Sequence, residues 1–259
     1  MTEFLAVTDL HYCMRNVQGD ERQNYLSKQK LENIIKRCPP ECDFVINLGD
    51  TADSQPGFGD QRFLAREIYS ALEKSGKPVY CAIGNHDTSL RKEELAEILR
   101  MPSRYYDFET EDFHCIVLDA NMNSPEKPLP ESEIEWSETY LDPSQLEFLK
   151  SSIDKADKPV LVFCHELFML GAYGEDNPHV IRNRDEAVSI FEESGKVKAV
   201  FCGHYHYGDH VKHGGVHYFT FNALVNYDEE SYAVVKAGRG KIIIEGHGLQ
   251  RSAELDYEI

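Results

Sequence analysis

Histidines, aspartates and one asparagine recur in short blocks along this sequence, each directly after an apolar run. The blocks are Asp9-Leu10-His11, Gly49-Asp50-Thr51-Ala52-Asp53, Gly84-Asn85-His86-Asp87, His165-Glu166 and Gly203-His204-Tyr205-His206. Imidazole, carboxylate and amide oxygen, without a thiolate, are ligands that suit manganese, iron or zinc. A lone histidine after a strand is more often structural than a ligand, but five such blocks in chain order reverse that expectation. The pattern predicts a metal centre assembled from distant segments.

The apolar runs that precede the blocks are typical of buried strands. Runs rich in β-branched and aromatic residues lie at 4–7, 44–48, 78–83, 114–118, 159–164 and 198–202. Amphipathic stretches that indicate helices lie between them, at about 20–37, 60–75, 91–100, 143–156 and 184–194. Alternation of strands and helices predicts a largely parallel sheet, whose carboxyl strand ends share one edge. We therefore expect the five blocks to meet at that edge.

The last part of the chain has a different pattern. The runs at 216–221, 232–237 and 241–246 predict an antiparallel end to the domain. The irregular acidic stretch 121–141 is interpreted either as a lid or rim of the site or as a surface insertion. Trp136, within it, either stacks on a substrate or fixes the stretch to the core. A length of 259 residues fits one domain over 1–259.

Composition limits the classes of partner. The formal net charge of −18 repels phosphate backbones, so long nucleic acid is not an expected partner. No apolar stretch is long enough to span a bilayer, and the apolar run at 4–7 leads straight into the first polar block, which leaves no room for a secretory signal. Seven cysteines without a CxxC pair suit reduced thiols. We expect a cytoplasmic protein whose partner is a small molecule.

The ordered set D-x-H, G-D-x-x-D, G-N-H-D, H and G-H-x-H, between residues 9 and 206, resembles the calcineurin-like metallophosphoesterase superfamily. The pattern is closest to bacterial class III cyclic-nucleotide phosphodiesterases and nucleotide pyrophosphatase-like members. The resemblance implies an α/β fold, a four-layer αββα sandwich around two mixed β-sheets, and a pair of metal ions, with manganese, iron or zinc as candidates.

The resemblance also implies roles for individual residues. It assigns the first metal to Asp9, His11, Asp50 and His206. It makes Asp50 the bridge to the second metal, which is completed by Asn85, His165 and His204. It makes His86 the catalytic histidine near the leaving-group oxygen, with Asp87 placed to orient its ring. Asp53 is interpreted either as a turn or cap residue or as a residue that supports the ligands.

These assignments predict a metal-dependent phosphoesterase. Two divalent ions with the Asp9 and Asp50 carboxylates and a bridging hydroxide keep about one net positive charge, which draws an anionic ester into an acidic protein. We expect the hydroxide to attack a small phosphodiester, such as a cyclic nucleotide or nucleotide-type ester. A phosphomonoesterase with the same metals is the alternative, and a non-catalytic binding module on the same fold is a remote one. For His179, Arg182 and Arg184, surface or structural roles are favoured over contact with a substrate.

Overall fold

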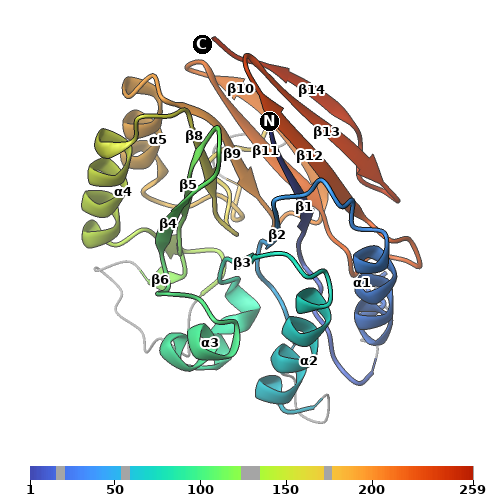
Figure 1. Ribbon diagram of the computed structural model, residues 1–259. Coiled ribbons are helices and arrows are strands. Elements are labelled where there is room, and N and C mark those ends of the chain that lie inside the picture. The colour runs from blue at the N-terminus through green and yellow to red at the C-terminus, as the bar shows by residue number, and fades with distance from the viewer. Residues whose placement is uncertain (16–20, 54–58, 124–134, 172–176, 259) are drawn as a thin grey trace.

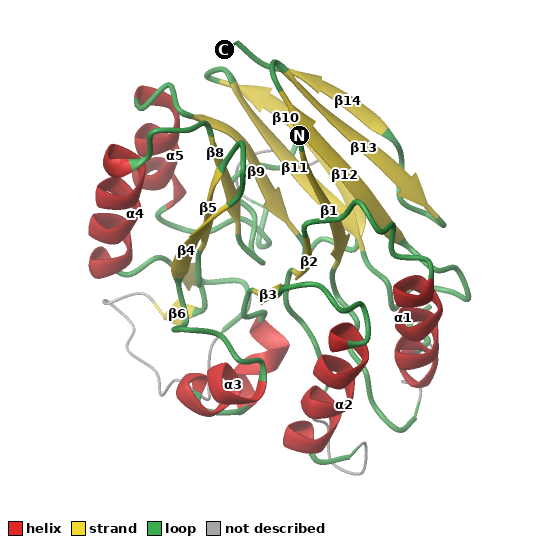
Figure 2. Ribbon diagram, viewed as in Figure 1, coloured by secondary structure: helices red, strands yellow, loops and turns green. Residues whose placement is uncertain are grey.

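The structure, a computed structural model, describes residues 1–15, 21–53, 59–123, 135–171 and 177–258. Two six-stranded mixed sheets pack face to face. Helices α1 and α2 cover the outer face of one sheet, and α4 and α5 cover the outer face of the other (Figures 1 and 2). This arrangement confirms the expected four-layer αββα sandwich.

The first sheet has the strand order β14-β13-β12-β1-β2-β3. Its strands are β14 (Ala253–Asp256), β13 (Lys241–His247), β12 (Tyr232–Gly238), β1 (Thr2–Val7), β2 (Phe44–Asn47) and β3 (Val79–Cys81). Strands β1, β2 and β3 run parallel, so their carboxyl ends lie at one edge. Strands β12, β13 and β14 continue the sheet beyond β1 in antiparallel pairs, as expected for 232–246.

The second sheet has the order β10-β11-β9-β8-β5-β4. Its strands are β10 (Tyr207–His213), β11 (Val216–Asn222), β9 (Val197–Cys202), β8 (Val160–Phe163), β5 (His114–Val117) and β4 (Tyr106–Glu109). The run 216–221 was expected beside the antiparallel terminal strands, and this is wrong. As β11 it pairs parallel with β9 in this sheet, because the edge strand β10 first carries the chain back. A separate two-stranded sheet joins β6 (Met122–Asn123) and β7 (Thr139–Tyr140).

Most helices lie where the amphipathic pattern predicts them. They are η1 (Asn24–Leu26), α1 (Ser27–Lys36), α2 (Gln61–Glu73), η2 (Asn85–Ser89), α3 (Lys92–Ile98), α4 (Pro143–Lys155) and α5 (Arg184–Glu193). The Asp142 side chain accepts a hydrogen bond from Gln145 N at the start of α4, with Pro143 in the first helical position. The helix expected from about residue 20 begins only at Ser27, because residues 21–23 form hydrogen bonds with another loop.

Side chains alternate along the inner strands and so serve two cores. Phe4 and Ala6 of β1 face the layer between the sheets, whereas Leu5 and Val7 face α1 and α2. In the inner layer Phe4 stacks on Phe44 with ring centroids 4.8 Å apart. Burial of each such aromatic side chain contributes roughly 1.5–3 kcal/mol of hydrophobic free energy. None of the described helices is both long and apolar enough to cross a bilayer.

Candidate metal centre

The predicted ligands lie at the carboxyl ends of strands from both sheets. Asp9 and His11 follow β1, Asp50 follows β2, His165 follows β8 and His204 follows β9. Backbone hydrogen bonds join the loops, from Asp9 N to the Gly49 carbonyl at 3.1 Å and from His11 N to the Asp50 carbonyl at 2.8 Å. The His204 N–H donates to the Asp9 Oδ2 atom of the other sheet at 3.0 Å. The site is therefore the meeting place of two sheet edges, where the strand–helix pattern alone predicted one.

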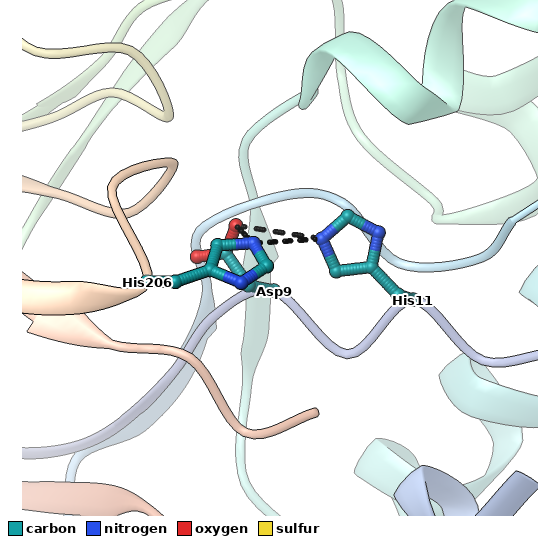
Figure 3. A group of neighbouring side chains, drawn as sticks. All are labelled: Asp9, His11 and His206. Atoms are coloured by element: carbon teal, nitrogen blue, oxygen red, sulfur yellow. Dashed lines mark hydrogen bonds and ion pairs between the residues drawn. The ribbon is translucent and has the colours of Figure 1, made fainter. Parts of the chain in front are cut away.

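A first group of ligand-type side chains consists of Asp9, His11 and His206, which point toward one another (Figure 3). The Nε2 atom of His206 lies 3.3 Å from Asp9 Oδ1, and the Nε2 atom of His11 lies 3.7 Å from the same oxygen. The two Nε2 atoms are 3.1 Å apart. One cation fits among three ligand atoms that converge in this way.

A second group consists of Asp50, His165 and His204, all buried. Asp50 Oδ2 lies 3.2 Å from Nε2 of His165 and 3.4 Å from Nε2 of His11, which belongs to the first group. A single carboxylate oxygen thus faces ring nitrogens of both groups. This is the placement that a bridging ligand between two cations requires.

Hydrogen bonds at the opposite ring nitrogens orient three of the histidines. The Nδ1 atom of His165 lies 2.8 Å from the Leu48 carbonyl oxygen, so its N–H donates there and Nε2 keeps its lone pair. The Nδ1 atom of His11 contacts Asp53 Oδ1 at 2.8 Å, and that of His206 contacts Asn226 Oδ1 at 3.3 Å. Such partners are characteristic of metal-binding histidines, whose tautomer and ring direction they set.

Buried polar atoms without a hydrogen bond test whether these residues fit metal ions. Among the described residues, such atoms include Asp9 Oδ1, Asn85 Oδ1, His165 Nε2 and His204 Nε2. Burial of an unpaired polar atom costs about 1–3 kcal/mol, so a native structure rarely leaves several in one place. Each of the four belongs to a predicted ligand, and two bound cations would satisfy them. The donor set fits the metal pair.

Electrostatics in the centre favour positive charge. Burial opposes ionisation of Asp50, but the charges of His165, His86 and His11 hold the pKa of its carboxyl below the ordinary value. Burial likewise opposes protonation of His11, yet the Asp53 and Asp50 carboxylates raise the pKa of this imidazole to about 10. The carboxylates therefore favour positive charge in this buried space, and a cation bound here would take the place of the proton on His11.

The backbone of the predicted ligands is strained in a common way. Seven described residues other than glycine have positive φ, and five of them are predicted ligands: Asp9 (52°), His11 (45°), Asp50 (51°), His204 (66°) and His206 (46°). Positive φ is uncommon for residues with a Cβ, and such strain persists mainly where function requires it. The sequence pattern gave no sign of it, because side-chain type alone does not report a backbone angle.

Comparison with known proteins agrees with the geometry. The family described as calcineurin-like phosphoesterase matches residues 2–208. The chain is a calcineurin-like phosphoesterase. It is 26% identical over 251 residues to a Danio rerio protein named serine/threonine-protein phosphatase CPPED1, with 91% of this chain and 78% of that protein covered. It is 28% identical over 233 residues to an Arabidopsis thaliana protein named manganese-dependent ADP-ribose/CDP-alcohol diphosphatase, with 73% of each covered.

A solved structure confirms the fold of this phosphoesterase. The crystal structure of a dimetal phosphatase from Danio rerio superposes with a TM-score of 0.82 at 15% sequence identity, with 99% of each chain covered. Members of the family act with two metal ions, and the two ligand groups described above supply candidate positions for them. The protein is thus a metal-dependent phosphoester hydrolase, as the sequence predicted.

Three glycines of this phosphoesterase, each in one of the polar blocks, allow its loops to approach closely. A Cβ atom on Gly84 would lie 2.2 Å from both N and Oδ1 of Asp50, and one on Gly203 would lie 2.0 Å from Thr8 Oγ1 and 2.7 Å from Asp9 Oδ2. A Cβ on Gly49 would lie 2.6 Å from the Gly84 nitrogen. No side chain fits at these positions without moving a predicted ligand.

Gly203→Ala is expected to lower the free energy of unfolding by about 1–3 kcal/mol, because the added methyl group displaces Thr8 and Asp9. Metal content should fall in the same variant. Thermal unfolding and elemental analysis check both effects. Gly238→Ala is the matched control, since a Cβ there meets only Met1 atoms at 3.5 and 3.6 Å. Equal stability and metal content in the two variants would contradict the close approach.

The partner of the predicted catalytic histidine differs from the expectation. Nδ1 of His86 lies 2.8 Å from Asp53 Oδ1, so Asp53 orients the ring, and the assignment of that task to Asp87 is wrong. The Asp87 carboxylate instead accepts hydrogen bonds from Thr51 N at 2.9 Å and Gly84 N at 3.0 Å. It is fully buried and holds two loops together. Adjacent residues in a 3-10 turn point in different directions, which is why proximity in sequence misled.

Asp53 also links the rings of His86 and His11 to the segment before α1. Its Oδ1 atom faces Nδ1 of both His86 and His11 at 2.8 Å, and its Oδ2 atom accepts from Asn24 Nδ2 at 3.0 Å. Asn24 is buried and donates to the His11 carbonyl as well, at 2.7 Å. Of the two interpretations of Asp53, the supporting role is therefore the one the structure shows. Sequence analysis missed Asn24, which no ligand-type block contains.

A cavity of about 440 Å³ opens over the metal centre. Its wall includes Asp50, Asn85, His86, His204 and His206, and also Glu21, Arg22, Trp136, His179, Tyr205 and Tyr207. His179 was expected at the surface or in a structural role, but its ring lies 4.9 Å from that of His204. Arg182 and Arg184 do not belong to the described wall; Arg182 donates to the Ser137 carbonyl and Arg184 to the Phe168 carbonyl.

Trp136 provides evidence on the prediction that 121–141 forms a rim of the site. Its ring lies 5.1 Å from His179 and 5.9 Å from His204, and 43% of the residue is exposed. The residue thus lines the cavity and is not packed in the core. The rest of the expected lid, 124–134, and residues 172–176 of the segment 171–183 lie outside the described residues.

Proposed function

We propose that this phosphoesterase hydrolyses a small phosphodiester of nucleotide type. The observation that carries the proposal is the aromatic wall beside the metal centre, where Trp136 and His179 lie 5.9 and 4.9 Å from the His204 ring. A half-exposed indole next to a phosphoryl site suits stacking on a base. A cavity of about 440 Å³ has room for a nucleotide rather than for a phosphate alone.

The ligand assignments made from the sequence form part of the proposal. Asp9, His11 and His206 would hold one metal, Asn85, His165 and His204 would hold the other, and Asp50 would be shared between them. When bound, the ions supply Lewis-acid charge that draws in phosphoryl oxygens and promotes ionisation of water. Manganese is the metal we favour, because the name of the Arabidopsis thaliana relative specifies manganese dependence.

His86 is proposed to act on the leaving group. Asp53 holds its Nδ1 atom at 2.8 Å, so the ring directs Nε2 away from that partner, and the side chain is 34% exposed in the cavity wall. A water oxygen joins the phosphorus, the bond from phosphorus to the ester oxygen breaks, and the Nε2 proton passes to the departing oxygen. One proton of the attacking water goes to solvent, from which His86 regains the proton that it gave. General-acid assistance of this kind contributes about 10²–10⁴-fold to a rate.

Relative rates on two chromogenic esters test the diester preference. With Mn²⁺ present, kcat/KM for bis-p-nitrophenyl phosphate should exceed that for p-nitrophenyl phosphate by roughly tenfold or more, because the second ester arm gains contacts with the aromatic wall. A reversed order would establish the phosphomonoesterase instead, in keeping with the phosphatase name of the Danio rerio relative. A protein that retains metal and hydrolyses neither ester would favour the binding module.

A further inference from the structure

A buried lysine on α1 contacts four successive backbone carbonyls. Lys30 is 4% exposed, and its Nζ atom faces the carbonyl oxygens of Leu224 at 2.8 Å, Val225 and Asn226 at 3.4 Å, and Tyr227 at 2.5 Å. Burial lowers the pKa of Lys30 to about 8, so the ammonium form still dominates at neutral pH. Burial of a charge is unfavourable unless partners compensate for it, so this lysine requires an explanation.

The four carbonyls belong to the β11–β12 loop, residues 223–231. Carbonyl oxygens that converge on one point repel one another, so their arrangement requires a cation or several N–H donors. An ammonium group supplies both, with three N–H bonds to share among the four oxygens. Tyr227 adds strain to the loop, because its φ is 50° although it carries a Cβ. The conformation of the loop therefore depends on Lys30.

Two further side chains of α1 bind the same loop. Asn33 and Arg37 follow Lys30 by three and seven residues and both donate to the Glu230 carboxylate, Asn33 at 2.9 Å. Residues at these spacings lie on one side of a helix. Exposed ion pairs such as that of Arg37 with Glu230 contribute little to stability, so we expect the buried ammonium group to dominate the contact between α1 and the loop.

The β11–β12 loop also holds two of the three residues in the first ligand group. Ala223 N donates to the His206 carbonyl at 2.9 Å, and Val225 N donates to the Asp9 carbonyl at 3.0 Å. The Oδ1 atom of Asn226 lies 3.3 Å from Nδ1 of His206, which leaves Nε2 of that ring for a cation. Asp9 and His206 both have positive φ, a conformation that persists only where the surroundings hold it. Lys30 thus supports the loop that fixes both residues.

The second ligand group has different supports. Nδ1 of His165 lies 2.8 Å from the Leu48 carbonyl oxygen, far in sequence from the β11–β12 loop. The two groups are linked through Asp50 and through His204 N, which donates to Asp9 Oδ2 at 3.0 Å. A change in the loop should therefore affect the first group strongly and the second group only weakly.

We propose that Lys30 is a positioning residue for the first metal: by holding the β11–β12 loop, it sets the direction of the His206 ring and thereby the affinity of the first ligand group for a divalent cation. This inference rests on the ligand assignments of the proposed function and adds to them a residue that contacts neither ligand side chain nor substrate cavity. Loss of a residue that orients a metal-binding histidine lowers metal affinity about 10–100-fold. Because Lys30 acts through Asn226, we expect the lower end of that range.

Binding of Mn²⁺, measured by equilibrium dialysis, tests the inference with one ligand group disabled at a time. In a His204→Ala background only the first group is complete, and in a His206→Ala background only the second. Lys30→Met keeps an unbranched side chain without the charge. It should raise the dissociation constant for Mn²⁺ about tenfold in the first background and less than about threefold in the second. Lys30→Arg should recover part of the affinity, and Lys36→Met, an exposed change on the same helix, should leave both constants unchanged.

A double-mutant cycle tests the route to the metal centre. Asn226→Ala should cause the same selective loss, and its combination with Lys30→Met should add little, because both changes act on the His206 ring. Full additivity of the two losses would overturn the inference that Lys30 acts through this ring.

The other outcomes have distinct meanings. An equal change of affinity in the two backgrounds, or no change, overturns the inference, because general damage does not distinguish the groups. If Lys30→Met does not fold, Lys30→Gln keeps N–H donors without the charge, and an unchanged ratio of the two dissociation constants in that variant also overturns it. If neither His204→Ala nor His206→Ala lowers the number of bound Mn²⁺ ions, the ligand assignments of the proposed function are wrong, and the inference is refuted with them.

Discussion

Asp50→Asn is expected to reduce the metal content of the purified protein from two ions per chain to one or fewer, and to lower turnover of bis-p-nitrophenyl phosphate roughly a thousandfold or more. Asp50 Oδ2 lies 3.2 Å from His165 Nε2 and 3.4 Å from His11 Nε2, and Asp50 Oδ1 accepts from His86 N at 2.8 Å. An asparagine has one oxygen for both tasks. If that oxygen keeps the bond to His86 N, the NH₂ group faces the metals; if it faces the metals, the NH₂ group meets an N–H donor.

Elemental analysis and turnover on the same preparation measure both effects. Asp154→Asn, an exposed change on α4, is the control for loss of one negative charge. Thermal unfolding should show that Asp50→Asn still folds, because the carboxylate is neither a helix cap nor a packing element of the core. Two ions per chain with full activity in Asp50→Asn would overturn the bridging assignment, and with it the account of the metal centre.

His86→Ala should lower kcat by about two orders of magnitude or more while the metals remain bound. His86 does not belong to the groups Asp9, His11, His206 and Asp50, His165, His204; it lies in a third cluster with His11 and Asp53, where its Nδ1 atom contacts Asp53. Removal of the imidazole therefore takes away a proton donor and leaves the ligands in place. The loss should be smaller for p-nitrophenyl esters than for alkyl phosphodiesters, because nitrophenolate departs without a proton.

His213→Ala is a matched control, since that imidazole is 61% exposed and pairs with Glu192 away from the cavity. It should retain both metal content and rate. Two results would contradict the proposed role of His86 as proton donor to the leaving group. A rate loss that is equal for good and poor leaving groups would show that the residue does not protonate the ester oxygen. A parallel loss of metal would show that it is a ligand.

Much of the fold, and the convergence of the proposed ligands at one place, could be predicted because each strand end carries two signals in the sequence. An apolar run gives the strand, and a polar block directly after it gives a position at the sheet edge, as with FLAV before Asp9 and AVFC before His204. Glycines 49, 84 and 203 add the close approach that the structure shows. These signals are local in the sequence, so they can be recognised without knowledge of the tertiary structure.

The remaining features depend on contacts between distant segments. Asp53 orients His86 across a separation of 33 residues, and Arg22 enters the cavity because residues 21–23 pair with 225–227 instead of continuing α1. The sequence before Ser27 has a local preference for helix, but the pairing of residues 21–23 with 225–227 overrides it. Trp136 had two interpretations from sequence, and the exposed position of its ring beside His204 argues against the one in which it fixes the stretch to the core.

Five of the proposed ligands combine positive φ with a side chain that the proposed metal centre requires. Glycine would relax each of these turns, but it would delete the group that the turn exists to present. Neither natural selection nor protein engineering can therefore relieve the backbone strain of these loops by substitution to glycine. Mutations that raise thermal stability should therefore lie in the sandwich itself, where they improve packing of the aromatic layer or of the outer helices. The free energy that they add offsets the backbone strain at the site.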